Sequence, residues 1–144
     1  YPPPDVVARD FAAMAANGIN AVRTYTPPPR YLLDRAQDHG LRVMVGMPWE
    51  QHVTFLETRA QAQDIRQRVA AQAKQLAGPP ALLCLSIGNE IPASIVRWHG
   101  RKRIEAFLRD LYHAAKLPPA KRKVLVEHAN DLGASADEIL AWLS

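Results

Sequence analysis

The chain has 144 residues, of which 48% are hydrophobic and 22% are charged. This composition is typical of a globular protein and excludes a disordered chain, while the length excludes two domains of ordinary size. The 18 basic and 14 acidic residues give a net charge of +4, which is too modest to indicate a particular kind of partner.

The sequence also argues against two classes of protein, those with a membrane-spanning helix and those held together by disulfides. No apolar run approaches the roughly 20 residues that a membrane-spanning helix needs, and no signal peptide opens the sequence. The one cysteine, Cys84, lies inside an apolar run, so neither a disulfide framework nor a thiolate metal cluster is expected. We expect no cofactor and no metal, and the cellular compartment stays open.

The hydrophobic pattern predicts one unit three times along the chain, namely an amphipathic helix, a glycine and a short apolar strand. The expected helices cover residues 5–17, 29–39 and 57–76, and the expected strands cover residues 19–26, 41–47 and 81–87. Alternating helices and buried strands indicate parallel strands joined by right-handed crossovers. We therefore predict an α/β fold, a parallel sheet of four to five strands with flanking helices, in a single domain over residues 1–144.

The last third of the sequence gives a less uniform pattern. A fourth helix is expected from Ser94 to Lys116, with Trp98 on its core-facing stripe. Residues 121–132 fit two structures, since a strand after a basic turn and a helix ending at Gly133 both match the spacing. A capping box at residues 135–138 predicts a last short helix. The strand or helix assignment of residues 117–144 thus stays open.

Polar and aromatic side chains follow each predicted strand at its carboxyl end, where parallel sheets bind ligands. They are Arg23, Thr24 and Tyr25 after the first strand, Trp49, Glu50, Gln51 and His52 after the second, and Asn89, Glu90, Trp98 and His99 after the third. Indole faces stack on the C–H surfaces of sugars, while carboxamides and carboxylates bind hydroxyl groups. A glutamic acid in a partly apolar cleft has the raised pKa that protonating a glycosidic oxygen requires. The set therefore predicts a carbohydrate substrate.

Three stretches of sequence carry a family resemblance. They read Gly-Ile-Asn-Ala-Val-Arg-Thr-Tyr over residues 18–25, His-Gly-Leu-Arg-Val-Met-Val-Gly-Met-Pro-Trp-Glu over 39–50, and Leu-Ser-Ile-Gly-Asn-Glu-Ile-Pro over 85–92. In this order they resemble consecutive strands of the (β/α)8 TIM-barrel domain of clan A retaining glycoside hydrolases. The similarity is closest to the family 2 type, which includes β-galactosidases, β-mannosidases and β-glucuronidases, and it covers roughly residues 5–116.

The resemblance implies hydrolysis of β-linked glycosides with retention, and it implies a role for each matching residue. Glu90 would be the general acid/base, and Asn89 would hydrogen-bond the sugar 2-hydroxyl. Arg23 matches the arginine of the family's second strand, which lies beside the nucleophile and keeps it ionised. The loop after the third barrel strand, a general position for sugar contacts in the family, corresponds here to Trp49, Glu50 and His52.

Parts of the family pattern have no counterpart in the sequence. These are the strand before Asp5 and everything after the fifth barrel strand, including the nucleophile glutamate of the seventh. A (β/α)8 barrel needs about 250 residues, so the chain corresponds to part of one. A retaining mechanism needs two carboxyl groups about 5–5.5 Å apart, and Glu50, the candidate nearest to Glu90 in this pattern, is not at the nucleophile's position. We therefore expect the isolated chain to be an inactive fragment.

Every candidate also has a structural interpretation that competes with the functional one. Glu90 can stabilise the N-terminus of the fourth helix, and Arg23 can form an ion pair at a strand end. The two tryptophans can pack at the edge of the core, and the histidines at positions 52 and 99 are more typical of surface residues. The structure has to decide between these roles.

Two other classes of function compete with a glycosidase. The basic residues at positions 97, 101–103 and 121–123 suit a nucleic-acid surface, but no aromatic residues interleave with them and no known motif accompanies them. We expect a solvated face there and no nucleic-acid partner. The other alternative is a non-catalytic carbohydrate-binding or self-associating half barrel, whose exposed strand edges pair with a second copy or with a missing half.

Overall fold

The computed structural model describes residues 1–115 and 123–126 of the chain. In order, its elements are α1 (Pro4–Ala16), β1 (Ala21–Thr24), α2 (Arg30–Asp38), β2 (Arg42–Met47), α3 (Arg59–Leu76), β3 (Leu82–Ile87), α4 (Ala93–His99), α5 (Arg101–Ala115) and β4 (Lys123–Val126). The strands pair in parallel in the order β1-β2-β3-β4. The fold is therefore α/β with a parallel sheet and flanking helices, as the alternating pattern predicts.

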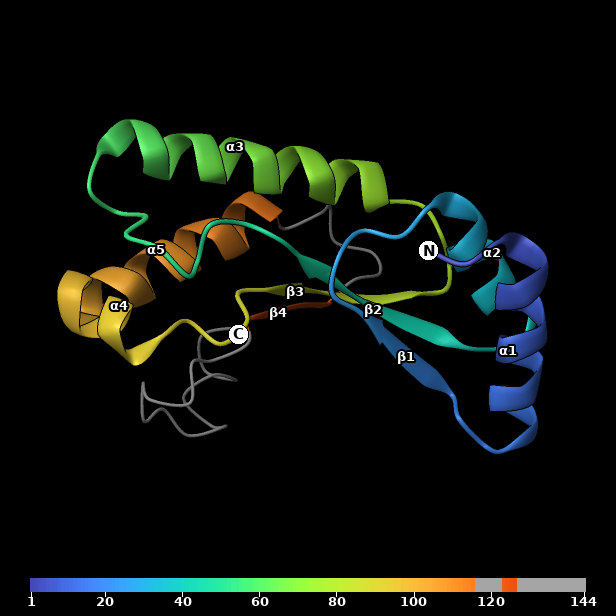
Figure 1. The fold of residues 1–144 in the computed structure, drawn as a ribbon. Coiled ribbons are helices and arrows are strands. Elements are labelled where there is room, and N and C mark those ends of the chain that lie inside the picture. The colour runs from blue at the N-terminus through green and yellow to red at the C-terminus, as the bar shows by residue number, and fades with distance from the viewer. Residues whose placement is uncertain (116–122, 127–144) are drawn as a thin grey trace.

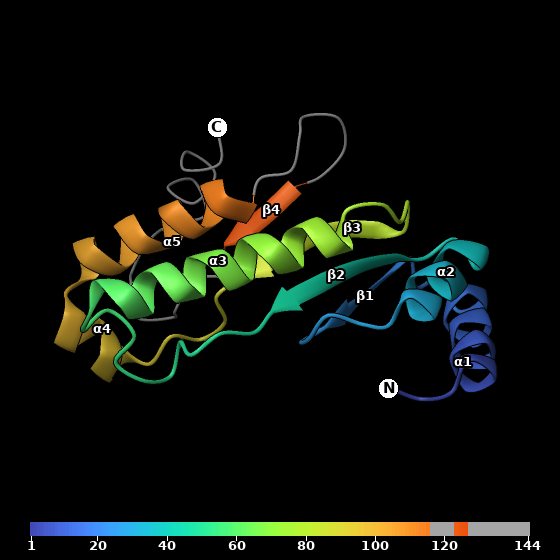
Figure 2. The ribbon, with the colours of Figure 1, turned by 90° about the horizontal axis from the view of Figure 1, so that it is seen from above.

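The sheet is covered on one face by two long helices. Figures 1 and 2 show α3 and α5 side by side over this face, with α4 at one end of the molecule and α1 and α2 at the other. The strand side chains that lie in this core include Val43, Val45, Leu85 and Ile87, none of which has any exposed surface. Burial of these branched side chains is what fixes the sheet register under the helices.

The C-terminal expectations meet the structure in two places. Residues 123–126 form a strand, which is one of the two alternatives for residues 121–132. The last short helix and the rest of residues 127–144 lie outside the described residues.

The expectation of one continuous helix from Ser94 to Lys116 is wrong. The structure has two helices, and Gly100 between them has a φ of +84°, in the left-handed region that favours glycine. The Gly100 N–H donates to the Val96 carbonyl, and the Gly100 carbonyl accepts from the next helix. This break changes the direction of the chain, so a helical period counted through Gly100 does not predict which residues face the core.

The carboxyl ends of β1 and β2 approach each other closely at Gly46. A Cβ atom at this position would lie 2.6 Å from the carbonyl oxygen of Tyr25 and 3.0 Å from that of Thr24. Both neighbours are backbone atoms, so only a glycine fits without moving a strand end. This contact positions the loops that leave the sheet here. No helix in the described part of the chain is long and apolar enough to cross a membrane.

Candidate functional site

Arg23 and Asn89 meet at the carboxyl end of the sheet, although they come from strands separated by β2. Arg23 Nη2 donates a hydrogen bond to Asn89 Oδ1 at 2.7 Å. The Arg23 guanidinium also lies over the ring of Tyr25, 4.7 Å from its centroid, in a cation–π contact. The structure thus brings together two of the residues that the strand-end argument grouped, because parallel strands end at a common edge.

Glu90 follows in a tight turn with an unusual backbone. Its φ is +53°, which is uncommon for a residue with a side chain, and Gly88 on the other side of Asn89 has a φ of +82°. Glu90 precedes Pro92, the N-cap of α4, and no acidic residue lies in the first turn of that helix. Glu90 is exposed, so the described residues do not supply the partly apolar cleft that the sequence led us to expect.

Gln51 belongs to the residues that the sequence places at the strand ends, but the sequence predicted no individual role for it. Its side chain is only 7% exposed, and its Oε1 accepts a hydrogen bond from the Asn89 backbone N–H at 2.7 Å. Its Nε2 faces His52 Nε2 at 3.4 Å, which brings His52 to the edge of the same network. Its place after the second predicted strand is a signal that it shares with its neighbours, so the sequence does not single out Gln51.

Trp49 lies in the hydrophobic core. It is 7% exposed, and its ring makes edge contacts with Phe55 and Phe107 at centroid distances of 4.8 and 5.9 Å. Its indole N–H has no hydrogen-bond partner among the residues that the structure describes. Its position corresponds to the packing role, one of the two roles that the sequence allowed.

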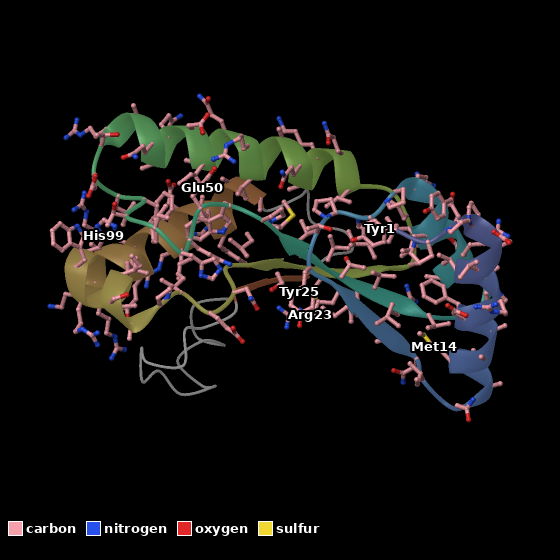
Figure 3. The ribbon with its side chains drawn as sticks, viewed as in Figure 1. Tyr1, Met14, Arg23, Tyr25, Glu50 and His99 are labelled. Atoms are coloured by element: carbon pink, nitrogen blue, oxygen red, sulfur yellow. The ribbon has the colours of Figure 1, made fainter. Side chains whose placement is uncertain are left out.

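Glu50 faces α3. Arg68 Nη2 of that helix lies 2.6 Å from Glu50 Oε2, and Arg68 Nε lies 2.9 Å from Asp64. The hydrogen bond from Arg68 lowers the pKa of the Glu50 carboxyl, which outweighs the opposing effect of partial burial. Figure 3 shows Glu50 under α3, whereas Arg23 and Tyr25 lie on the other side of the sheet. The structure therefore does not bring Glu50 together with the Arg23–Asn89 pair.

The two aromatic residues at the end of α4 exchange their expected positions. Trp98, expected on a core-facing stripe, is 70% exposed, and His99, expected at the surface, is 8% exposed. The break at Gly100 is the reason, because a helical period counted through this residue does not hold for both helices. Trp98 thus presents an exposed indole on α4.

His99 fastens the loop after β2 to the junction of α4 and α5. Its Nε2 accepts from the Leu56 N–H at 3.4 Å, and Arg103 donates to the Leu56 carbonyl. The ring lies 5.2 Å from that of Phe55. Burial lowers the pKa of His99, the Arg103 charge lowers it further, and Glu57 opposes both effects.

The remaining charged residues give little indication of another site. In the basic run at positions 101–103, Arg101 pairs with Glu105 at 2.5 Å and Arg103 bonds the Leu56 carbonyl. Among the described residues, no group of three or more His, Cys, Asp or Glu side chains is placed to hold a metal ion. The cation, carboxamide and carboxyl at the strand ends, beside a Tyr25 ring that is 68% exposed, are suited to binding hydroxyl groups.

No protein-family model and no curated protein matches the sequence. Solved structures do share its fold. A β-glucuronidase from Parabacteroides merdae aligns over 88% of this chain with a TM-score of 0.69 and 20% identity. A GH5_18 protein from Bifidobacterium longum aligns over 86% with a TM-score of 0.61 and 21% identity. A glycosyl hydrolase family 2 member from Bacteroides cellulosilyticus aligns over 94% with a TM-score of 0.57 and 22% identity.

The chain spans only a small part of each of these proteins. It covers 16% of the P. merdae enzyme, 39% of the B. longum protein and 17% of the B. cellulosilyticus protein. At such identities the likeness concerns the fold alone. The chain therefore has the fold of a segment of glycoside hydrolases, which agrees with the part of a (β/α)8 barrel expected from its sequence.

Proposed function

We propose that this chain is the acid/base-carrying part of a glycoside hydrolase domain of the family 2 type, acting on β-linked glycosides by a retaining mechanism. The observation that carries the proposal is the 2.7 Å hydrogen bond from Arg23 to Asn89. It joins the ends of the first and third described strands and leaves the neighbouring Glu90 exposed at the same edge. The fold shared with segments of glycoside hydrolases supports it.

In this mechanism Glu90 acts twice. Its protonated carboxyl gives the proton to the glycosidic oxygen as the bond from that oxygen to the anomeric carbon breaks, while a nucleophilic carboxylate bonds to the same carbon. The Glu90 carboxylate then takes a proton from a water molecule, whose oxygen bonds to the anomeric carbon and displaces the nucleophilic carboxylate from it. The Asn89 carboxamide, held by Arg23, bonds the 2-hydroxyl. We propose that the nucleophile lies outside these 144 residues, so that the isolated chain binds glycosides without hydrolysing them.

A binding experiment tests the carbohydrate site. We expect p-nitrophenyl β-glycosides, a β-glucuronide among them, to bind the chain weakly in ligand-observed NMR. Asn89→Ala and Arg23→Met should each weaken the binding by about tenfold, since each removes a charge-assisted hydrogen bond. The matched control is Arg9→Met, because Arg9 is exposed and, among the residues that the structure describes, pairs with its neighbour Asp10. If none of these β-glycosides binds, or if the α-anomers bind equally well, the proposed site is wrong.

A turnover assay tests the fragment part of the proposal separately. We expect the chain to show no Glu90-dependent release of p-nitrophenol from any glycoside of the panel. Wild type and Glu90→Gln should therefore give the same background signal. Clear Glu90-dependent release would show that the chain supplies a second catalytic carboxylate, and would refute the fragment proposal while leaving the acid/base role intact.

One observation favours a second candidate function, a self-associating or half-barrel-pairing module. Within the described residues β1 pairs only with β2, so its other edge is free, and the nearby Ile19 is 45% exposed. Free strand edges pair readily with other strands. Light scattering after size exclusion, over a range of concentrations, distinguishes the cases. A well-folded chain that stays monomeric throughout would reject this candidate.

A further inference from the structure

We propose that Gln51 is a positioning residue, whose buried carboxamide fixes the backbone turn that presents Asn89 and Glu90 at the sheet edge. Its meaning for catalysis rests on the proposed function, but its structural content can be tested independently. Nothing in the sequence resemblance gives this residue a role.

The first argument is the contact itself. Gln51 comes from the loop after β2, yet its Oε1 accepts from the backbone N–H of Asn89, which follows β3, at 2.7 Å. The Gln51 side chain is more than nine-tenths buried. Since buried polar groups need partners, the buried Gln51 carboxamide depends on this N–H. The bond therefore links the ends of two neighbouring strands.

The second argument is the conformation that the bond holds. Gly88 and Glu90, on either side of Asn89, both have positive φ, at +82° and +53°. A glutamate in this region is strained, and such residues persist only where the surroundings over-determine them. Asn89 is held at its backbone by Gln51 and at its side chain by Arg23. Two anchors on the central residue of the turn explain how Glu90 keeps its strained backbone.

The third argument is that Gln51 is itself held rigidly. The Gln51 N–H donates to the Trp49 carbonyl at 2.8 Å, and Trp49 is buried against Phe55. The Gln51 Nε2 group faces His52 Nε2. The histidine nitrogen can accept a hydrogen bond from it when it carries no proton, and the Gln51 Oε1 then faces Asn89. The core under the loop after β2 thus positions the turn after β3 through one side chain.

The test uses two variants of Gln51, one that removes the strong acceptor and one that keeps it. Gln51→Met keeps the length of the side chain but has no strong acceptor, whereas Gln51→Glu keeps an acceptor and loses the amide donor. The control is Gln63→Met, because Gln63 is exposed on α3. In ¹⁵N-labelled protein we expect Gln51→Met to speed hydrogen exchange of the Asn89 amide by at least about tenfold. Gln51→Glu and the control should retain the wild-type protection.

The same variants connect the turn to ligand binding. We expect the affinity for the β-glycoside that binds best to fall in Gln51→Met and to recover in Gln51→Glu. A merely structural role would not give this rescue, since both variants perturb the packing. Unchanged protection of the Asn89 amide in Gln51→Met, or a Gln51→Glu variant that behaves like Gln51→Met, would overturn the proposal.

If Gln51→Met does not fold, a measurement on the wild type tests whether Gln51 holds the Asn89 amide. Through-hydrogen-bond scalar coupling between the Asn89 amide nitrogen and the Gln51 carboxamide carbon is expected, and its absence would overturn the proposal. These readouts do not depend on sugar binding. If the coupling is present and no glycoside binds, the proposed function fails while the positioning role stands.

Discussion

The loops that follow β2 and β3 leave the same end of the sheet, yet their side chains have different surroundings. After β2, Trp49 is buried in the core and Glu50 is paired with Arg68 on α3. After β3, Asn89 meets Arg23 at the open edge and Glu90 is exposed. The comparison teaches that a position at a strand end is not sufficient for a role in binding. The side of the sheet on which the side chain lies decides whether it can join the Arg23–Asn89 edge.

The largest expected effect is a loss of stability, and it should differ between the two tryptophans. Trp49→Ala should lower the free energy of unfolding by about 3–5 kcal/mol, because it leaves a cavity beside Phe55 and Phe107. Trp98→Ala should change it by less than about 0.5 kcal/mol, because the indole is 70% exposed. Urea unfolding of both variants measures the difference. Equal losses of unfolding free energy would contradict the assignment of Trp49 to the core and of Trp98 to the surface.

The next prediction disturbs the carboxyl end of the sheet, from which both loops leave. Gly46→Ala should cost about 1–3 kcal/mol, because the new Cβ would lie 2.6 Å from the Tyr25 carbonyl oxygen. The displaced end of β1 should also weaken glycoside binding through Arg23. Gly78→Ala is the matched control, since a Cβ there meets only Arg30 Nη1 at 3.9 Å. A Gly46→Ala variant as stable as wild type would show that the strand ends are not closely packed.

A pH experiment tests the fastening of the loop after β2. Burial lowers the pKa of His99 below its ordinary 6.5, so the unfolded chain binds more protons and stability falls as pH drops from 6.5 through the lowered pKa. His99→Gln keeps an acceptor for the Leu56 N–H but does not titrate. Its stability should therefore vary less over this range.

The reference for that experiment is the wild-type chain at the same pH values. The measurement is denaturant unfolding at several pH values on either side of 6.5. A His99→Gln variant with the wild-type slope would indicate that His99 is not held neutral by the fold.

The smallest expected effect concerns Glu50. Its folded pKa is lowered by Arg68, so the pair stabilises the fold above the ordinary value of 4.5 and ceases to do so as pH falls through the lowered pKa. Both side chains are partly exposed, so Arg68→Met should cost at most about 1 kcal/mol at neutral pH. Lys74→Met, on the same helix, is the control.

Glycoside binding sharpens the contrast between the loops. Glu50→Gln should leave the affinity unchanged, because Glu50 lies on the α3 side of the sheet. A marked loss of affinity in Glu50→Gln would place that carboxylate at the ligand and remove the distinction between the two loops.

The sequence predicted the features that depend on local pattern. Three helix–strand units follow from hydrophobic periodicity, and the meeting of Arg23 and Asn89 follows from parallel strand ends. The sequence did not predict what tertiary packing decides. Whether Trp49 turns into the core depends on Phe107 of a distant helix, and the burial of His99 depends on the break at Gly100. The individual role of Gln51 was not predicted for the same reason, since its partner lies 38 residues further along the chain.

Chemical-shift mapping tests the central claim most directly, namely that the edge formed by Arg23, Asn89 and Glu90 binds β-linked glycosides. A p-nitrophenyl β-glycoside is titrated into ¹⁵N-labelled chain, and the perturbed amides are located on the structure. We predict that they cluster at residues 23–25, 51–52 and 88–90. Perturbations confined to the groove of Glu50, Asp64 and Arg68 beside α3, or none at saturating ligand, would contradict the account.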